Sequence, residues 1–296
     1  MTKRTWALLA AFTATFIYGA AYSIAKDVMP LYLKPYGFIL IRVMGAAILF
    51  WILDLFLPKE NVEISDYPKI FFTAIFGIAI NMLTFYKGLS LTTPINSAVI
   101  MITVPILVLI FSSILLKEKL SIKKGIGIIL GLLGAMILTV YGKSDPKIGT
   151  NVPWGNFLTL INAISYAFYL VIVKNLLAKY STFTFIKWFY LFGMILVFPF
   201  GISELLDVQW LVLPRFIVGE IVFIIVCSTF MTYLFNLLAL SQLKASTMSV
   251  FIYLQPVIAS FFAILMKTDH IDSIKLLASG LIFLGVYLAT TKKWTK

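Results

Sequence analysis

Long runs of apolar residues alternate with short polar segments along the whole chain. A helix that crosses the hydrocarbon core of a bilayer needs about 20 consecutive, mostly apolar residues. Ten runs come close to this length, and they predict membrane-spanning helices at 6–26, 36–57, 68–90, 95–116, 122–141, 153–178, 183–206, 214–241, 246–267 and 272–291. The segments between these runs are too short to form a soluble domain. The expected fold is therefore an all-α integral membrane protein with ten transmembrane helices.

The composition agrees with this pattern, because 61% of the 296 residues are hydrophobic and only 12% are charged. A soluble domain of this size cannot keep so much apolar surface away from water. The single Cys227 excludes an intramolecular disulfide and a cysteine-based metal site, and the single His270 excludes a histidine metal cluster. We therefore expect neither a metal nor a cofactor.

The net charge of +12 comes from basic residues scattered singly at the ends of the predicted helices. Nucleic-acid binding requires a basic stripe or run, so no nucleic-acid partner is expected. The Lys and Arg residues are more frequent in the segments that share a side with the N-terminus. The positive-inside rule then predicts a multi-pass protein of a bacterial inner membrane with both termini in the cytoplasm.

The second half of the chain repeats the pattern of the first half. A shift of 148 residues pairs Trp6 with Trp154, Tyr18 with Tyr166, Ile24 with Ile172, Lys26 with Lys174 and Phe50 with Phe198. A shift of 151 residues pairs Leu89 with Leu240, Ser90 with Ser241, Pro105 with Pro256, Lys124 with Lys275 and Gly134 with Gly285. These pairs predict two repeats, at 1–143 and 152–293, with five helices in each.

Because five is an odd number, the second repeat enters the membrane from the side opposite to the first. Inverted repeats are a recurrent design of secondary transporters, in which the two halves exchange conformations and open a central site to each side in turn. The pattern therefore favours a carrier that works by alternating access. A duplication that only built a stable membrane scaffold stays as the alternative, since a fold does not decide a function.

A stretch in each half also carries a family resemblance. In the first half it holds Tyr86-Lys87-Gly88-Leu89, the segment 93–98, Pro105, Glu118 and a glycine-rich fifth helix. In the second half it holds Ala239-Leu240, Ala245-Ser246, the segment 253–256, Asp269 and Gly285. Together these residues resemble the EamA family of the drug/metabolite transporter superfamily. Two departures are Tyr18-Gly19, where the family often has Trp-Gly, and the segment 267–270, which replaces the usual small residue followed by Glu.

The resemblance implies a ten-helix carrier, proton-coupled or facilitated, that often exports amino acids, metabolites or toxic compounds without ATP or a prosthetic group. It also implies that helices one, three and four surround a central cavity. The expected partners are a small-molecule solute, membrane lipids and, as an open alternative, protons. A monomer and a homodimer are both compatible with the sequence.

Polar residues inside a membrane span usually face a cavity or another helix, because exposing them to lipid is costly. The predicted solute-binding residues are Tyr18, Arg42, Asn81, Tyr86, Asn96, Asn162, Tyr166, Tyr169, Tyr233, Asn236, Tyr253 and Gln255. Helical spacing puts Asn162, Tyr166 and Tyr169 on one stripe. We also expect a second stripe of Thr229, Tyr233 and Asn236 to line the same cavity. The alternative is that the tyrosines form interfacial belts and that the amides and hydroxyls only join helices.

Two basic residues fall inside predicted spans, and both could attract a solute that carries a carboxylate. Lys87 lies about one turn from a helix end, where a long basic side chain can reach the headgroups. Arg42 lies deeper and is the better candidate. Among the acidic residues, only Glu220 falls well inside a span, where it either takes part in proton coupling or pairs with Arg215.

Four further residues have predicted structural or gating roles. Pro105 and Pro256 are expected mid-helix, where each would free a backbone carbonyl and allow a kink. Glu118 and Asp269 follow helices four and nine and are expected to order a tight turn and cap the next helix, with a gating role as the alternative. Gly127 and Gly131 form a small-residue pattern that fits either a dimer face or packing inside the bundle.

The sequence thus predicts a secondary transporter of small metabolites, acting as an exporter, rather than an enzyme. The alternative class is an intramembrane lipid-modifying enzyme, which needs a compact group of His, Asp or Glu around a nucleophile. His270 stands by itself at a predicted helix end and does not supply such a group.

Overall fold

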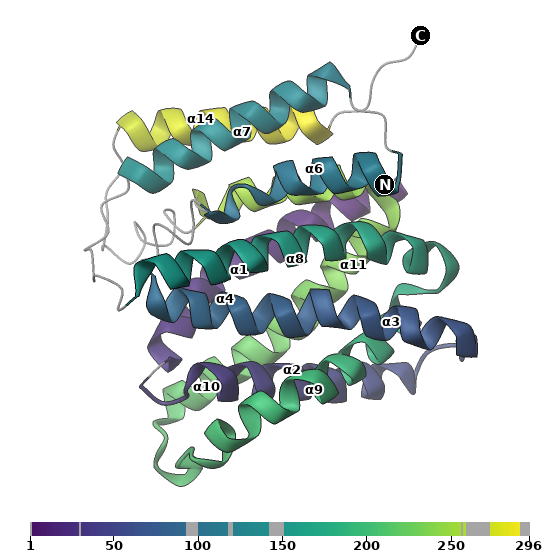
Figure 1. The fold of residues 1–296 in the computed structure, drawn as a ribbon, viewed down its shortest axis with the longest axis vertical. Coiled ribbons are helices and arrows are strands. Elements are labelled where there is room, and N and C mark those ends of the chain that lie inside the picture. The colour runs from purple at the N-terminus through teal and green to yellow at the C-terminus, as the bar shows by residue number, and fades with distance from the viewer. Residues whose placement is uncertain are drawn as a thin grey trace. The chain divides into compact units, whose positions relative to one another are not determined.

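The computed structural model describes residues 2–29, 31–92, 100–117, 121–141, 151–255, 257–258 and 273–290. Within these ranges every regular element is a helix and none is a strand (Figure 1). Five helical stretches there are long and apolar enough to cross a membrane, namely Pro35–Asp54, Ile64–Leu91, Val152–Lys179, Thr182–Leu206 and Arg215–Gln242. The prediction of an all-α membrane protein is confirmed at this level.

The described helices lie within or close to the predicted ranges, although the ranges 95–116 and 246–267 are described only in part. In the first half they are α1 (Lys3–Val28), α2 (Pro35–Asp54), η1 (Ile64–Asp66), α3 (Tyr67–Ala74), η2 (Ile75–Ala79), α4 (Ile80–Leu91), α6 (Val104–Leu115) and α7 (Ile122–Tyr141). In the second half they are α8 (Val152–Lys179), α9 (Thr182–Leu206), η3 (Trp210–Val212), α10 (Arg215–Phe223), η4 (Ile224–Met231), α11 (Thr232–Gln242), α12 (Ala245–Met248), η5 (Ser249–Tyr253) and α14 (Ser273–Thr290).

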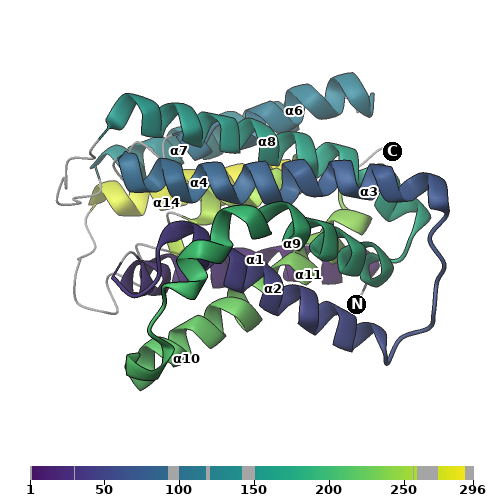
Figure 2. The same ribbon diagram turned by 60° about the horizontal axis from the view of Figure 1, so that its bottom comes forward.

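Two of the long helices contain a π-helical segment. The elements α3, η2 and α4 lie in one line (Figure 2), and α10, η4 and α11 likewise follow one another without a break in the helix. Both η2 and η4 are π-helices. The 151-residue shift moves η2 onto residues 226–230, which lie inside η4. The same irregularity therefore occurs at matching places in the two halves, and π-helical turns are frequent at functional sites.

The chain divides into two compact units, and each unit takes helices from both sequence halves. Unit 1 holds residues 1–87 and 172–242, and unit 2 holds residues 88–171 and 243–296. The units are defined by contacts, whereas the predicted repeats at 1–143 and 152–293 are defined by sequence similarity. The two divisions of the chain are therefore different.

In unit 1, α2 and α9 pack side by side and run antiparallel. At one end the Glu204 carboxylate accepts the backbone N–H groups of Tyr36 and Gly37, at 2.7 and 2.9 Å. At the other end Lys187 Nζ lies 2.7 Å from Asp54 Oδ2. The N-terminus of α2 has no side-chain cap, so the carboxylate from α9 satisfies amide groups that the helix cannot pair itself.

In unit 2, α7 and α14 also pack antiparallel, with their backbones in direct contact (Figure 1). A Cβ atom at Gly127 would lie 2.7 Å from the Gly285 carbonyl oxygen, and one at Gly134 would lie 2.7 Å from the Ala278 carbonyl oxygen. The 151-residue shift converts Gly127 into Ala278 and Gly134 into Gly285. The two contacts are therefore equivalent under exchange of the two helices, as a local two-fold axis requires.

The glycine pattern on α7 serves packing within unit 2. Gly131 lies under the ring of Tyr253, where a Cβ atom would approach the Tyr253 Cδ2 atom to 2.3 Å. Gly127 and Gly131 both contact α14 or η5, so of the two predicted alternatives the structure favours packing inside the bundle. Gly280 on α14 differs, because a Cβ atom there would meet nothing within 4 Å.

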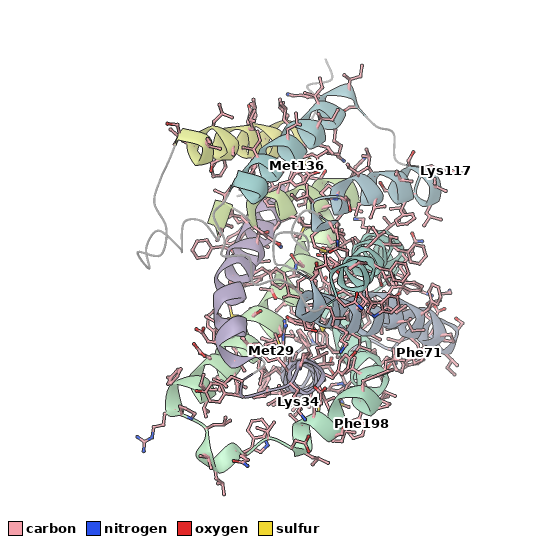
Figure 3. The ribbon with its side chains drawn as sticks, turned by 60° about the vertical axis from the view of Figure 1, so that its left-hand side comes forward. Met29, Lys34, Phe71, Lys117, Met136 and Phe198 are labelled. Atoms are coloured by element: carbon pink, nitrogen blue, oxygen red, sulfur yellow. The ribbon has the colours of Figure 1, made fainter. Side chains whose placement is uncertain are left out.

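Large apolar side chains point outward from many of the helices. Phe71 on α3 and Phe198 on α9, both labelled in Figure 3, are exposed, as is Met136 on α7. In water such exposure would be unfavourable, whereas a lipid environment removes that cost. The outward apolar faces are those expected of helices in a bilayer.

The prediction that Pro105 lies in the middle of a helix is wrong. Residues 102 and 103 form a turn, and Pro105 occupies the first turn of α6. A proline in the first turn costs no helical hydrogen bond, because the amide at that position has no partner within the helix. Pro105 thus begins a helix where the sequence suggested a kink.

Candidate solute-binding site

Arg42 is a buried cation on α2. Its side chain is only 4% exposed, and the residue lies about 10 Å along the helix from Pro35, at a rise of about 1.5 Å per residue. Its Nε atom donates to Thr229 Oγ1 at 3.0 Å, and its Nη1 atom donates to the Tyr86 hydroxyl oxygen. Because the guanidinium is covered by protein, it does not reach the surface in the way that basic residues near helix ends commonly do.

Thr229 is held in place by the irregular helix η4. Its hydroxyl donates to the carbonyl oxygen of Ile224, five residues earlier, at 2.8 Å. That spacing is the one that a π-helix creates. The hydroxyl oxygen is then oriented to accept from Arg42, and Thr229 itself is fully buried. The π-helical segment thus fixes one side of the guanidinium.

Aromatic side chains surround the rest of the Arg42 side chain. The guanidinium carbon lies 5.4 Å from the ring centres of both Phe38 and Tyr86, which themselves meet edge to face at 5.6 Å. Tyr18, Tyr190 and Tyr233 also lie within electrostatic reach of the cation. Aromatic faces stabilise a cation through their quadrupole, and more so away from water.

A second set of polar groups adjoins this one within unit 1. The Tyr18 hydroxyl lies close to the side chains of Thr232 and Asn236. The Tyr233 ring packs edge to face on Tyr190, with ring centres 5.3 Å apart, and its hydroxyl lies 3.5 Å from the carbonyl oxygen of Gly77 in η2. Residues on α1, α2, α4, α9 and α11 therefore converge around Arg42.

No carboxylate of unit 1 neutralises Arg42. Unit 1 contains eight acidic residues, and all of them are described. Six of them have other partners. Four form ion pairs: Asp54 with Lys187, Glu63 and Asp66 with Lys179, and Asp207 with Lys34. Two more accept backbone N–H groups, Glu60 from Ser181 and Glu204 from Tyr36 and Gly37. The other two, Asp27 and Glu220, lie near each other, and neither is within 4.0 Å of a described basic nitrogen.

Lys187 provides a contrast, since it is the other buried cation among the described side chains of unit 1, at 8% exposure. Its ammonium group has a carboxylate partner in Asp54 and also lies 5.4 Å from the ring centre of Trp51. Taking a charge out of water costs several kcal/mol unless a counter-charge offsets it. Lys187 has that counter-charge from Asp54, whereas Arg42 has none among the acidic residues of unit 1.

Glu220, the acidic residue that falls well inside a predicted span, lies near Asp27 and not within ion-pair distance of a described basic residue. The expected pairing with Arg215 does not form among the described residues, and Glu220 Oε2 is buried without a hydrogen-bond partner there. Asp27 is its acidic neighbour. Lys87, the second predicted cation, is exposed, which fits the alternative that it extends towards the headgroups.

Of the predicted binding residues, six lie in unit 1. Tyr18, Arg42, Tyr86, Tyr233 and Asn236 belong to the Arg42 group as described above, and Asn81 is half-buried on α4. The structure adds Phe38 and Tyr190 to this group. Neither carries a signal in the sequence, because an aromatic residue in an apolar helix is indistinguishable from ordinary packing.

Five of the other predicted binding residues lie in unit 2. Asn162 and Tyr169 are buried on α8, with Tyr166 half-buried and its ring centre 6.1 Å from that of Tyr169. Tyr253 is fully buried in η5, its hydroxyl has no hydrogen-bond partner among the described residues, and Gln255 is half-buried. The single cavity that combines these residues with the Arg42 group stays a prediction. Asn96, Glu118, Pro256 and Asp269 lie outside the described residues.

Comparison with known proteins assigns the chain to a family. The profile of the EamA-like transporter family matches residues 5–140 and again residues 153–291. A protein of Archaeoglobus fulgidus named "Uncharacterized transporter" is 29% identical over 98% of this chain and 100% of its own length. "Uncharacterized transporter YoaV" of Bacillus subtilis is 26% identical over 96% of each chain.

The fold is shared with a solved protein as well. A crystal structure with 17% sequence identity superimposes with a TM-score of 0.79 and covers 97% of both chains. At this identity the likeness concerns the fold alone. With the family profile matching nearly the whole chain and with apolar helices long enough to cross a bilayer, the protein is a multi-pass membrane transporter that belongs to the EamA-like transporter family.

Proposed function

We propose that this protein is a secondary transporter that exports small metabolites by alternating access, and that it is built from two inverted five-helix repeats. The solute is a small organic molecule, and the coupling ion, where there is one, is the proton. Both termini lie in the cytoplasm, and the chain acts without ATP or a cofactor. The repeats correspond to residues 1–143 and 152–293.

The observation that carries the proposal is the antiparallel packing of equivalent helices. Under the sequence shifts, α2 is equivalent to α9 and α7 is equivalent to α14. Both pairs pack antiparallel, α2 with α9 inside unit 1 and α7 with α14 inside unit 2. Two copies of one helix that run in opposite directions are what an inverted repeat requires. This geometry supports alternating access, in which the halves exchange conformations.

Two further observations support the same proposal. The family profile matches the chain twice, over ranges that fall within the proposed repeats. The π-helical segments η2 and η4 occur at matching places in the two halves. A π-helical turn leaves carbonyl groups less tightly paired than an α-helix does and so offers a place at which a helix can bend.

Transport in proteoliposomes tests the proposal. The purified protein is reconstituted, and uptake and counterflow are measured for a panel of radiolabelled amino acids and metabolites, with and without a pH gradient. Saturable uptake and counterflow above the level of protein-free liposomes are expected for at least one solute. Asn236→Ala, which removes a polar side chain beside Tyr18, is expected to raise KM.

A pH gradient that changes the rate would identify the proton as the coupling ion, whereas equal rates would identify facilitated transport. Absence of transport for every solute, from protein that is folded and inserted, would contradict the proposal. The intramembrane enzyme and the membrane scaffold would then be the remaining explanations.

A further inference from the structure

We infer that Arg42 binds the carboxylate of the transported solute and that this solute is a monoanion with an apolar body. The inference rests on the proposed function and names the class of its substrate. Arg42 is a buried cation whose hydrogen-bond partners, Thr229 and Tyr86, are both neutral. No acidic residue of unit 1 lies within ion-pair distance of it.

The guanidinium retains donors that the protein does not use. It carries five N–H groups, and the described bonds engage Nε once and Nη1 once. Nη2 donates to no described residue, and Nη1 carries a second N–H group that bonds to no described residue. These two nitrogens form the fork that binds both oxygens of a carboxylate. A bidentate ligand therefore fits the donors that remain.

Tyr86 supplies a further contact for the same ligand. Its hydroxyl oxygen accepts from Arg42 Nη1, and the hydroxyl proton is then directed away from the guanidinium. In the proposed complex, a carboxylate oxygen bound at Nη1 and Nη2 also accepts that proton. Tyr86 thus both orients the guanidinium and donates to its ligand, so the binding site needs the Tyr86 hydroxyl as well as the cation.

The charge balance favours a carboxylate over a phosphate. Lys187, the only other buried cation among the described side chains of unit 1, is already neutralised by Asp54. A single guanidinium balances one negative charge. The second negative charge of a phosphate dianion would therefore have no positive charge to balance it. The surrounding rings of Phe38, Tyr86 and Tyr190 offer apolar contact to the rest of the solute.

Equilibrium binding to the purified, detergent-solubilised full chain tests the inference. The probes are acetate, benzoate, 3-phenylpropionate and leucine, each compared with its primary amide, and phenyl phosphate serves as the dianion. The readout is the shift of the melting temperature with probe concentration, from which a Kd is fitted. The inference predicts that at least one carboxylate stabilises the protein while its amide and phenyl phosphate bind at least about 10-fold more weakly.

Variants separate binding by Arg42 from general effects of charge. Arg42→Gln is expected to weaken carboxylate binding about 10- to 100-fold, and Tyr86→Phe about 10-fold, with each variant still melting cooperatively. Arg215→Gln, which removes an exposed arginine of the same unit, is expected to bind as the wild type does. Arg42→Lys keeps the charge but loses the fork, so an intermediate loss is expected.

Equal binding of acids and amides, stabilisation by none of the carboxylates, or unchanged binding in Arg42→Gln would each overturn the inference. These outcomes are distinguishable from failure of the proposed function. Carboxylate binding that depends on Arg42, in protein that transports nothing, would contradict transport and keep the site. Transport of a neutral or cationic solute that is unaffected by Arg42→Gln would keep the transporter and reject the carboxylate.

Discussion

Arg42 on α2 and Thr229 on η4 are joined by a hydrogen bond of 3.0 Å between two buried side chains. Thr229 in turn donates to the Ile224 carbonyl oxygen. The guanidinium is thereby tied to the π-helical segment η4. The position of the cation depends on the local geometry of the opposite sequence half.

This relationship predicts different outcomes for two substitutions of Thr229. Thr229→Val removes the acceptor for Arg42 Nε, so one fixed contact of the guanidinium is lost and carboxylate affinity should fall about 2- to 10-fold. Thr229→Ser keeps the hydroxyl and should bind nearly as the wild type does. The measurement is the Kd for the best carboxylate probe, and equal affinity in the two variants would contradict a positioning role for the hydroxyl.

The contact between α7 and α14 predicts a sharp difference between two glycines on one helix. Gly285→Leu would place a side chain against the backbone of Gly127 and Gly131, whereas Gly280→Leu would project into open space. Overpacking of this kind costs about 1–3 kcal/mol or more. Gly285→Leu should lower the melting temperature of the purified protein, and Gly280→Leu should leave it nearly unchanged. Equal effects would show that the two helices do not pack through Gly285.

The two lysine–aspartate pairs of α2 and α9 predict unequal effects on stability. Lys187 and Asp54 have side chains that are 10% and 17% exposed, whereas those of Lys34 and Asp207 are 60% and 64% exposed. Breaking a buried pair leaves an uncompensated charge and costs about 3–5 kcal/mol, while an exposed pair contributes about 0–1 kcal/mol. Asp54→Asn should therefore lower the unfolding temperature far more than Asp207→Asn. The opposite order in thermal unfolding would contradict the burial of the Asp54 pair.

Much of the fold follows from the sequence because span length and apolar character are strong signals. The range predicted at 122–141 coincides with α7, and the range at 153–178 differs from α8 by one residue at each end. The π-helical turns could not be predicted, because they arise from packing between helices and do not change the pattern of apolar residues along the sequence. The position of Pro105 was misjudged for a related reason, because an apolar run does not reveal a turn within it.

The candidate site was predictable only where a residue type is unusual in a membrane span. Arg42 is conspicuous for its charge, and Tyr18 and Asn236 for their polarity, and the structure brings these three into one group. Tyr190 and Phe38 have no distinguishing signal in the sequence, because aromatic residues are common in apolar helices. The sequence also could not show that Arg42 has no counter-charge from unit 1, since this depends on where the eight acidic residues of that unit lie in three dimensions.

The inverted repeat is the central claim, and the sidedness of two equivalent loops tests it most directly. Leu31 lies in the loop between α1 and α2, and Ser181 lies in the equivalent loop between α8 and α9; both residues are exposed. Each is replaced by cysteine in a Cys227→Ala background, and intact cells are treated with a membrane-impermeant maleimide. We expect Leu31→Cys to react from outside and Ser181→Cys to react only after the membrane is permeabilised, whereas labelling of both from the same side would contradict the inverted repeat.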